Sequence, residues 1–308
     1  LRKLQFNSSG EEVLRENKRA PQQGGTVVTT IDLEWQKRAE EVLAKHAHKG
    51  ALVIIDVRTG ELVAMASRPS YDLNTFVPFI TSKDYTALRE NPDAPLFARS
   101  YQAEYPPAST FKAVVALSAL QNGVLDRYTQ INTPAFVQLG KHQMWNWSKK
   151  PEGLMNVVKA LYRSNNPFFI QVGIATRPQN IIHTAKQLGY GSKTGLPLVG
   201  EKPGLLPNDT YMSKYHKRRM TDGDTANMSI GQGVLLATPL QVAQGMAGIA
   251  NGGRLPKLQL VRQVQDPNGR IISYNRAEPR QLMNMRASDV SLVQEGLMKV
   301  VNNPAGTG

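Results

Sequence analysis

A serine and a lysine stand three residues apart in "YPPASTFKAVVALSAL" (105–120), where the apolar pattern after the serine predicts a helix. Two prolines precede Ser109 and place it at the helix N-terminus, where backbone N–H groups and the helix dipole favour negative charge. Lys112 lies on the same helix face, with its Cβ about 5–6 Å from that of Ser109. A serine hydroxyl is a weak nucleophile, and a lysine whose pKa is lowered by burial can act as its base. A serine helix cap followed by a solvated lysine would show the same pattern.

A second group of polar side chains lies further along the chain in "LYRSNNPFFIQVG", where Ser164, Asn165 and Asn166 end a helical run. A second hydroxyl near Lys112 could relay its proton, and an asparagine amide could orient a substrate carbonyl or amide. Serines and asparagines also collect in loops for local reasons, so this triplet alone is unspecific. The occurrence of both groups in one chain favours a catalytic serine over a simple helix cap.

The elements that must position these residues include both helices and strand pairs. Helical patterns cover the ranges 29–47, 109–122, 156–164, 178–188, 238–250 and 288–303. Two hairpins are predicted, one from 51–57 and 61–67 around "RTG", and one over 252–275 around Pro267–Asn268–Gly269. Strands at both ends of a helix-rich middle predict an α+β fold, an antiparallel sheet sandwiched by helices with a helix-rich subdomain.

The first 25 residues differ in pattern from the rest of the chain. They alternate weakly in "KLQFN" and then become polar up to Gly24–Gly25, which predicts a strand and a linker from a preceding domain. Residues 1–25 are therefore assigned to the remnant of an N-terminal domain, and residues 26–308 to the main domain.

Composition excludes several classes of chemistry. With no cysteine, the chain can form neither disulfides nor thiolate or cysteine metal sites, and its 5 histidines show no spacing typical of metal ligands. We therefore expect no metal and no cofactor. The net charge of +13 is compatible with anionic partners, but the basic run "KYHKRR" (214–219) lacks the features of a nucleic-acid module and is expected to be a solvated face or loop. No stretch reaches the ~18 apolar residues of a membrane span.

Several segments together resemble the transpeptidase domain of the class B, monofunctional penicillin-binding proteins. They occur in order as "TTIDLEWQKRAEEVL", "GALVIIDVRTGELVAMASRPSYDLN", "YPPASTFK", "RSNNPFF" and "MSIGQGVLLATPLQVAQGMAGIANGG". The "IGQG", "ATPLQVA" and "MWNWSKK" segments are most similar to the elongation-type branch, penicillin-binding protein 2. The resemblance implies the fold of penicillin-binding proteins and serine β-lactamases. It also identifies 1–25 as the end of a non-catalytic pedestal domain.

The resemblance carries roles onto particular residues. Ser109 would be the acylated nucleophile and Lys112 its base, while Ser164 and Asn166 would form the second catalytic motif. Ala108 departs from the family, which usually has glycine before the serine, and an alanine there removes some backbone freedom.

Three further residues are predicted to contact the substrate. They are Asn165, inside the second motif, and Trp145 and Trp147, which precede it and would either line the groove or pack locally.

The third motif of this family is K-[ST]-G on a strand opposite the serine. "GYGSKTGLPL" contains Lys193–Thr194–Gly195, but it directly follows a helix end and precedes a segment too rich in proline and glycine for a central strand. We predict that this copy is a structural loop. The motif itself is expected beyond Gly308, which would make the domain C-terminally incomplete.

The implied function is a peptidoglycan D,D-transpeptidase that crosslinks stem peptides ending in D-Ala–D-Ala and is acylated by β-lactam antibiotics. It would act in cell elongation and shape, beside a glycosyltransferase of the elongation machinery. The location implied is the periplasmic face of a bacterial inner membrane, through an N-terminal anchor absent from this chain. A D,D-carboxypeptidase, a β-lactam sensor and a catalytically silent scaffold remain alternatives on the same fold. A serine β-lactamase is disfavoured because no deacylating glutamate can be located.

Overall fold

The computed structural model describes residues 2–17, 23–282 and 284–308. The chain divides into two compact units, one formed by Leu1–Thr30 with Val261–Arg276 and the other by Ile31–Leu260 with Ala277–Gly308. Every residue predicted to act in the site lies in the second unit.

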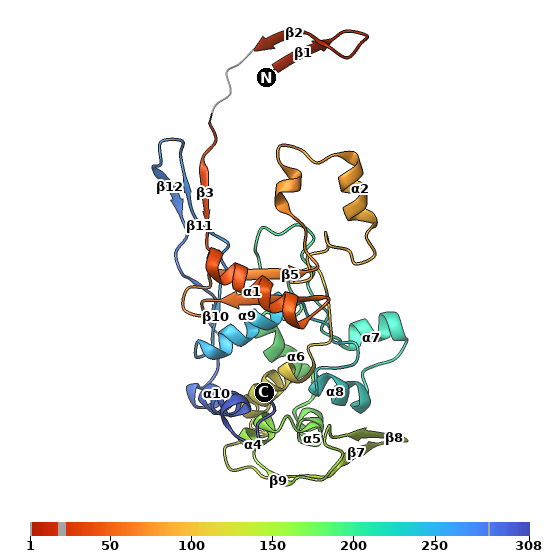
Figure 1. The fold of residues 1–308 in the computed structure, drawn as a ribbon. Coiled ribbons are helices and arrows are strands. Elements are labelled where there is room, and N and C mark those ends of the chain that lie inside the picture. The colour runs from red at the N-terminus through yellow and green to blue at the C-terminus, as the bar shows by residue number, and fades with distance from the viewer. Residues whose placement is uncertain (1, 18–22, 283) are drawn as a thin grey trace. The chain divides into compact units, whose positions relative to one another are not determined.

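The first unit contains only strands among its described residues. An antiparallel hairpin and a three-stranded antiparallel sheet in the order β12-β11-β3 make it up (Figure 1). Their bounds are β1 (Arg2–Phe6), β2 (Glu12–Asn17), β3 (Thr26–Thr29), β11 (Val261–Gln265) and β12 (Ile271–Tyr274). The strand predicted near the N-terminus is confirmed, but β2 occupies part of the stretch predicted as linker, and residues 18–22 of that linker lie outside the described residues.

The hairpin predicted over 252–275 is wrong in extent. The turn at Asp266 is present, with its carboxylate accepting from the N–H groups of Asn268 and Arg270, but this hairpin spans only β11 and β12. The preceding strand β10 (Arg254–Pro256) pairs instead with β13 (Pro279–Leu282) in the second unit. Burial explains the split, because Leu255 and Leu258 are almost fully buried in the second unit.

The predicted sandwich of a strand pair between helices is confirmed in the second unit. Strands β4 (Gly50–Ile55) and β5 (Leu62–Arg68) pair antiparallel, α1 (Leu33–His46) packs against β5, and α9 (Pro239–Ala250) packs against β4 (Figure 1). Ala39 and Leu43 of α1 form one apolar cluster with Ala64 of β5. Leu62 of β5 forms another with Leu240 of α9. Apolar side chains of the hairpin are therefore covered by a helix on either side.

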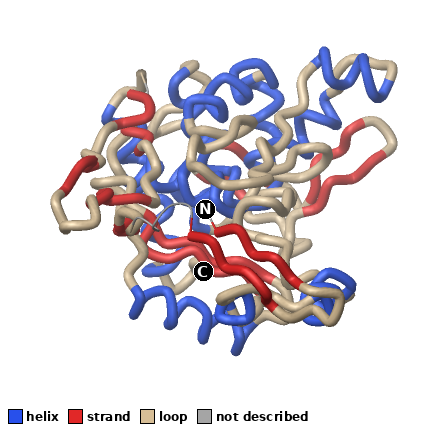
Figure 2. Tube along the Cα trace, turned by 90° about the horizontal axis from the view of Figure 1, so that it is seen from above, coloured by secondary structure: helices blue, strands red, loops and turns tan. Residues whose placement is uncertain are grey.

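The helix-rich subdomain surrounds α3, the helix that follows the candidate nucleophile. Every residue of α3 from Lys112 to Leu120 is buried, and α4, α5, α6 and α10 pack around it. The helices of this region are the 3₁₀ turn η2 (Ala108–Phe111), α3 (Lys112–Gln121), α4 (Val157–Tyr162), α5 (Asn166–Thr176), α6 (Pro178–Gln187), α7 (Asp209–His216), α8 (Asp222–Ser229) and α10 (Ala287–Asn302). Figure 2 shows how long loops join these helices to the strands.

Short elements complete the second unit. The segment between β5 and α3 carries the 3₁₀ turn η1 (Leu73–Phe76) and α2 (Ser82–Glu90). Two antiparallel strand pairs lie between α3 and α4, formed by β6 (Ile131–Thr133) with β9 (Gly153–Met155) and by β7 (Phe136–Leu139) with β8 (His142–Trp145). The predicted helices are confirmed to within a few residues, whereas α2, α5, α7, α8 and these four strands were not predicted. Among the described residues no helix combines the length and the apolar character needed to cross a bilayer.

Candidate active site

Ser109 lies in an exposed tight turn at the start of the central helix, as its sequence predicts. It is in the 3₁₀ turn η2, which continues directly into α3. The preceding residue, Ala108, has a φ of +51°, a left-handed conformation that costs most side chains energy and that glycine adopts freely. The backbone of Gly231 holds this turn from behind, because its carbonyl accepts from the Ala108 N–H at 2.8 Å. A Cβ at Gly231 would lie 1.9 Å from the Ala108 carbonyl oxygen, so the close approach requires glycine.

Lys112 is buried beneath the serine and connects the two predicted motifs. Its side chain is only 2% exposed. Its Nζ lies 3.2 Å from the Ser109 Oγ and 3.1 Å from the Ser164 Oγ. It also donates to the Ser164 carbonyl and to the Asn166 Oδ1, each at 2.7 Å. The structure therefore brings together the four residues predicted to be catalytic.

The environment of Lys112 favours its neutral form. Burial lowers the pKa of Lys112 from 10.5 to about 7, because a charged ammonium loses its hydration there. The four oxygens that it contacts belong to neutral groups. A neutral amine at 3.2 Å can accept the proton of the Ser109 hydroxyl, so the pair has the geometry of a nucleophile and its base.

The second motif lies on the short connection between α4 and α5. Ser164 has a φ of +49°, the second left-handed non-glycine residue that contacts or adjoins the Ser109–Lys112 pair. Conformations of this kind cost on the order of 1–3 kcal/mol each and tend to cluster at functional sites. Here the left-handed residue directs both its hydroxyl and its carbonyl at Lys112.

Asn165 does not have the role predicted for it. Its side chain is fully buried and caps the N-terminus of α5, with its Oδ1 accepting from the Phe168 N–H at 2.8 Å. A buried cap offers no surface to a ligand, and we therefore correct the prediction that Asn165 binds substrate. The triplet Ser164–Asn166 alternates in direction, with its outer members facing Lys112 and its middle member facing the core.

Trp145 and Trp147 are both about half exposed, at 45% and 53%. Trp145 stacks obliquely on Phe136 of the paired strand, with ring centroids 4.8 Å apart. Trp147 donates from its indole N–H to the Arg163 carbonyl at 2.9 Å, next to the second motif. Both tryptophans thus lie beside the motif with ring surface exposed, and their contact with substrate stays a prediction.

Asn146, between the two tryptophans, was missed by the sequence analysis. Its Oδ1 accepts from the Asn166 N–H at 3.1 Å, and the Trp145 carbonyl accepts from the Asn166 Nδ2 at 3.0 Å. The segment 145–146 therefore holds both the backbone and the side chain of Asn166. Nothing in the sequence signals this contact, since it joins a strand end to a helix start 20 residues away along the chain.

The segment Lys193–Gly195 is a loop, as predicted. No strand is assigned to it, and Thr194 is buried with both its hydroxyl and its N–H donating to the Glu201 carboxylate, at 2.6 and 2.7 Å. The Lys193 carbonyl accepts from Arg280 at 2.8 Å, while the lysine itself is exposed. The hydroxyl of this triplet is thus already engaged inside the loop.

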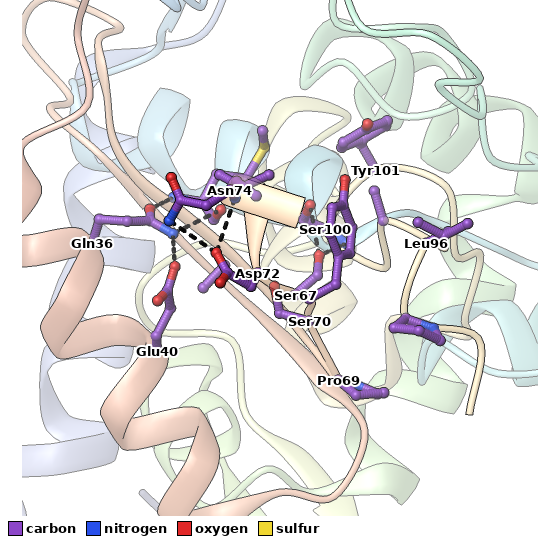
Figure 3. A pocket seen from close by; sticks show the side chains of 16 residues that line it. Gln36, Glu40, Ser67, Pro69, Ser70, Asp72, Asn74, Leu96, Ser100 and Tyr101 are labelled. Atoms are coloured by element: carbon purple, nitrogen blue, oxygen red, sulfur yellow. Dashed lines mark hydrogen bonds between the residues drawn. The ribbon is translucent and has the colours of Figure 1, made fainter. Parts of the chain in front are cut away.

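A cavity of about 460 Å³ lies elsewhere in the second unit, between α1, β5 and the segment 69–101 (Figure 3). Its polar side chains bind one another. Gln36 donates to Glu40 and forms two hydrogen bonds with the backbone of Met65 in β5, and Asn74 donates to Asp72. The cavity contains neither Lys112 nor any of the three residues that it contacts. Ser67 of β5 attaches the segment 69–101, because its hydroxyl donates to the Ser100 Oγ at 3.2 Å and accepts from the Ser100 N–H at 3.1 Å.

An exposed serine above a buried lysine, with a serine and an asparagine completing the lysine's contacts, is the arrangement predicted for the acyl-transfer site of a serine penicillin-binding protein. The comparison with known families agrees, because the model of the penicillin-binding protein transpeptidase domain matches residues 50–308. The chain therefore belongs to the penicillin-binding protein transpeptidase family.

Named relatives place the chain more narrowly. It is 34% identical to the peptidoglycan D,D-transpeptidase MrdA of Escherichia coli K12, over 99% of this chain and 48% of that protein, so it spans about half of that relative's length. Among solved structures it resembles Pseudomonas aeruginosa PBP2 in complex with WCK 5153, with a TM-score of 0.83 and 33% identity, covering 92% of this chain and 64% of that one. It also resembles the penicillin G acyl-enzyme complex of penicillin-binding protein A from Mycobacterium tuberculosis, with a TM-score of 0.79 and 26% identity over 92% of this chain and 65% of that one.

Proposed function

We propose that this chain forms the acyl-transfer centre of an elongation-type peptidoglycan D,D-transpeptidase. The observation that carries the proposal is the position of Lys112, buried and in contact with both Ser109 and the second motif. Family membership and the activity named for the Escherichia coli relative support the same reaction.

In the first half of the reaction, neutral Lys112 accepts the proton of the Ser109 hydroxyl as Oγ attacks the carbonyl of the penultimate D-alanine. Charge develops on the carbonyl oxygen, and the Ser109 N–H, in the first turn of its helix, is one donor available to stabilise it. The bond to the terminal D-alanine then breaks. The proton held by Lys112 passes to the departing amine, with the Ser164 hydroxyl, 3.1 Å from Nζ, as the relay.

In the second half, an amine of a neighbouring stem peptide attacks the acyl-serine. Lys112 again accepts the proton, the new amide forms, and Ser109 is regenerated with its hydrogen. Asn166 orients the substrate amide with the hydrogen of its Nδ2 that does not bond to Trp145. Trp145 and Trp147 line the approach beside the second motif. Penicillins acylate the same serine because their strained amide occupies the place of the peptide carbonyl.

The setting that we propose is the periplasmic face of a bacterial inner membrane, with an N-terminal anchor and a glycosyltransferase partner of cell elongation. Residues 1–25 would belong to a non-catalytic pedestal, and the K-[ST]-G motif would follow Gly308. Both assignments rest on family resemblance and can be tested on the intact gene product.

The test is covalent labelling of the intact protein. After incubation with a labelled penicillin, digestion and mass spectrometry should find the adduct on the peptide that contains Ser109, and Ser109→Ala should remove it. Absence of any adduct from the intact, folded protein would contradict the proposal. An adduct that forms while purified stem peptides are only hydrolysed would indicate a carboxypeptidase instead.

A further inference from the structure

We propose that Glu152 is a positioning residue for this acyl-transfer site, acting through Asn146 on Asn166. The inference rests on the proposed function for its catalytic meaning. Its structural content is that the partly buried ion pair of Glu152 and Arg163, outside the motifs, keeps Asn166 against Lys112 and limits the access of water to that lysine.

Asn166 is held at three points. Its backbone N–H donates to the Asn146 Oδ1, its Nδ2 donates to the Trp145 carbonyl, and its Oδ1 accepts from Lys112. As the first residue of α5, it has a backbone N–H that no carbonyl of the helix can accept. Asn146 therefore satisfies an orphan donor and fixes the residue that contacts the lysine.

Asn146 is itself held by Glu152. The side chain of Asn146 is 1% exposed, and its Nδ2 donates to the Glu152 Oε1 at 2.9 Å and to the Ser148 Oγ at 2.9 Å. With its Nδ2 committed to the carboxylate, the amide must present its oxygen to Asn166. A carboxylate at position 152 thus selects the orientation of Asn146 that the site needs.

Arg163 fixes the carboxylate from the other side. The Arg163 Nε donates to the Glu152 Oε2 at 2.8 Å, and the two side chains are only 22% and 13% exposed. The guanidinium lies over the Trp147 ring at 5.3 Å, and the Trp147 indole donates to the Arg163 carbonyl. Arg163 immediately precedes Ser164, so the ion pair joins the segment 145–152 directly to the second motif.

The hydrogen bonds that run from Arg163 through Glu152 and Asn146 to Asn166 depend on one another because the site is poorly hydrated. Removing the charge of Glu152 leaves Arg163 without its ion-pair partner. The Asn146 amide is then held by the Ser148 hydroxyl, which can donate as well as accept and therefore does not select the amide's orientation. Asn166 would then lose its backbone acceptor, and water could enter beside Lys112. Because burial is the cause of the low pKa of Lys112, that hydration would raise the pKa towards its ordinary value.

Direct electrostatics predicts the opposite sign. Removing a nearby negative charge destabilises an ammonium and would lower the pKa of Lys112. The direction of the change therefore distinguishes positioning by Glu152 from a simple effect of its charge.

The chain offers a matched control in the ion pair between Asp289 and Arg286. The Asp289 carboxylate is 10% exposed and accepts from the Arg286 Nε at 2.9 Å, at the start of α10. Asp289→Asn removes the same charge from a similarly buried carboxylate that, within the described part of the chain, makes no hydrogen bond to Lys112 or to the residues that contact it.

The experiment follows the titration of Lys112 by NMR in the intact protein labelled at lysine Cε, with Lys112→Arg to assign the signal. In Glu152→Gln the midpoint should rise by about one unit or more, and in Asp289→Asn it should stay at the wild-type value. Penicillin acylation at pH 7 should slow about fivefold in Glu152→Gln and recover at high pH, since a one-unit rise from a pKa of about 7 lowers the neutral fraction of Lys112 from about a half to about a tenth. Asn146→Ala, which changes no charge, should raise the midpoint in the same direction and keeps the test open should Glu152→Gln fail to fold.

An unchanged or lowered midpoint in a folded Glu152→Gln variant overturns the inference, and so does an equal rise in Asp289→Asn. If Glu152→Gln does not fold, an unchanged midpoint in Asn146→Ala overturns it. The NMR result does not depend on reaction with penicillin, so it separates this inference from the proposed function. A wild-type protein that forms no adduct on Ser109 contradicts only the function.

Discussion

The segments Ser109–Lys112 and Lys193–Gly195 each place a lysine within three residues of a hydroxyl side chain, and the fold uses them in opposite ways. In one, Lys112 is buried and contacts only neutral oxygens, while Ser109 is exposed above it. In the other, Lys193 is exposed and Thr194 is buried, with its hydroxyl engaged by Glu201. Chemistry needs an accessible nucleophile and a base of lowered pKa, so the first arrangement can react and the second stabilises a loop.

The largest difference should appear when each lysine loses its amine. Lys112→Met should slow penicillin acylation of Ser109 by about 10²–10⁴-fold, the usual contribution of a positioned base. Lys193→Met should leave the rate within about twofold, because that side chain is exposed and its recorded bond is made by its carbonyl. Rates measured by stopped-flow or gel labelling on both variants would test this. Equal losses would mean that the loop takes part in the reaction.

The pH dependence of the acylation rate should follow the titration of Lys112. Acylation requires the neutral amine, so its rate should rise with pH through about 7 and then level off. The folding stability has a related sign. Between about 7 and 10.5 the unfolded chain binds more protons at this lysine than the folded chain does, and stability should therefore rise with pH in that window, by several kcal/mol at most.

Lys112→Met is the control for this rise in folding stability. Because methionine does not titrate, the stability of that variant should lack the contribution of Lys112 to the pH dependence. Urea unfolding of both proteins at pH values on either side of 7 and at about pH 9 would measure it. An identical pH dependence in the two proteins would show that Lys112 is not shielded from water.

In the loop 193–195, the Thr194 hydroxyl rather than the Lys193 amine should contribute to the protein, and it should contribute to folding stability and not to acylation. Thr194→Val keeps the side-chain shape but leaves the Glu201 carboxylate without one donor, which should cost about 1–3 kcal/mol of unfolding free energy. Acylation of Ser109 should stay unchanged in the folded protein. Thr194→Ser, which keeps the hydroxyl, is the control for both measurements. A large loss of acylation without loss of stability would reassign the loop to the site.

The smallest effect concerns the backbone next to the nucleophile. Ala108→Gly stabilises the folded state by removing the cost of a left-handed alanine, about 1–2 kcal/mol. It also stabilises the unfolded chain by about 0.4–1 kcal/mol, because glycine gives that chain more conformational entropy. The net result should be a stability gain between about 0 and about 1.6 kcal/mol, read from urea midpoints. A clear loss of stability would mean that the methyl group of Ala108 makes a contact that outweighs the strain.

Local pattern predicted α3, α4, α6 and α10 of the helix-rich subdomain but missed α5, which carries Asn166, and also α7 and α8. The long apolar run after Ser109 specifies a buried helix wherever it packs, and the paired strands 51–57 and 61–67 follow from their turn and their apolar residues. Shorter elements such as β6 to β9 escaped prediction, because three- and four-residue strands exist only through their partners. The false extent of the hairpin over 252–275 has the same origin, since β10 pairs with β13 rather than with its neighbours in sequence.

The residues of the site also divide into those that the sequence predicted and those that only the structure revealed. Two short motifs, together with the family resemblance of the segments around them, predicted catalytic roles for Ser109, Lys112, Ser164 and Asn166. Asn165 was misassigned because its type and position fit substrate binding as well as they fit a helix cap, and only the start of α5 at Asn166 decides between the two. Asn146 and Glu152 carry no motif at all.

By itself, the sequence determined the types and spacing of the candidate reactive side chains, that a helix presents Ser109 at its first turn, and that the loop at Lys193 follows a helix end. The tertiary structure alone decided that Lys112 is dehydrated, that Ser164 and Asn166 meet it, and that Asn146 and Glu152 stand behind them. The physical reason is the separation along the chain over which each effect acts. Helix formation and turn chemistry depend on neighbours in the chain, whereas desolvation and hydrogen bonding to Lys112 depend on groups that only folding brings within about 3 Å.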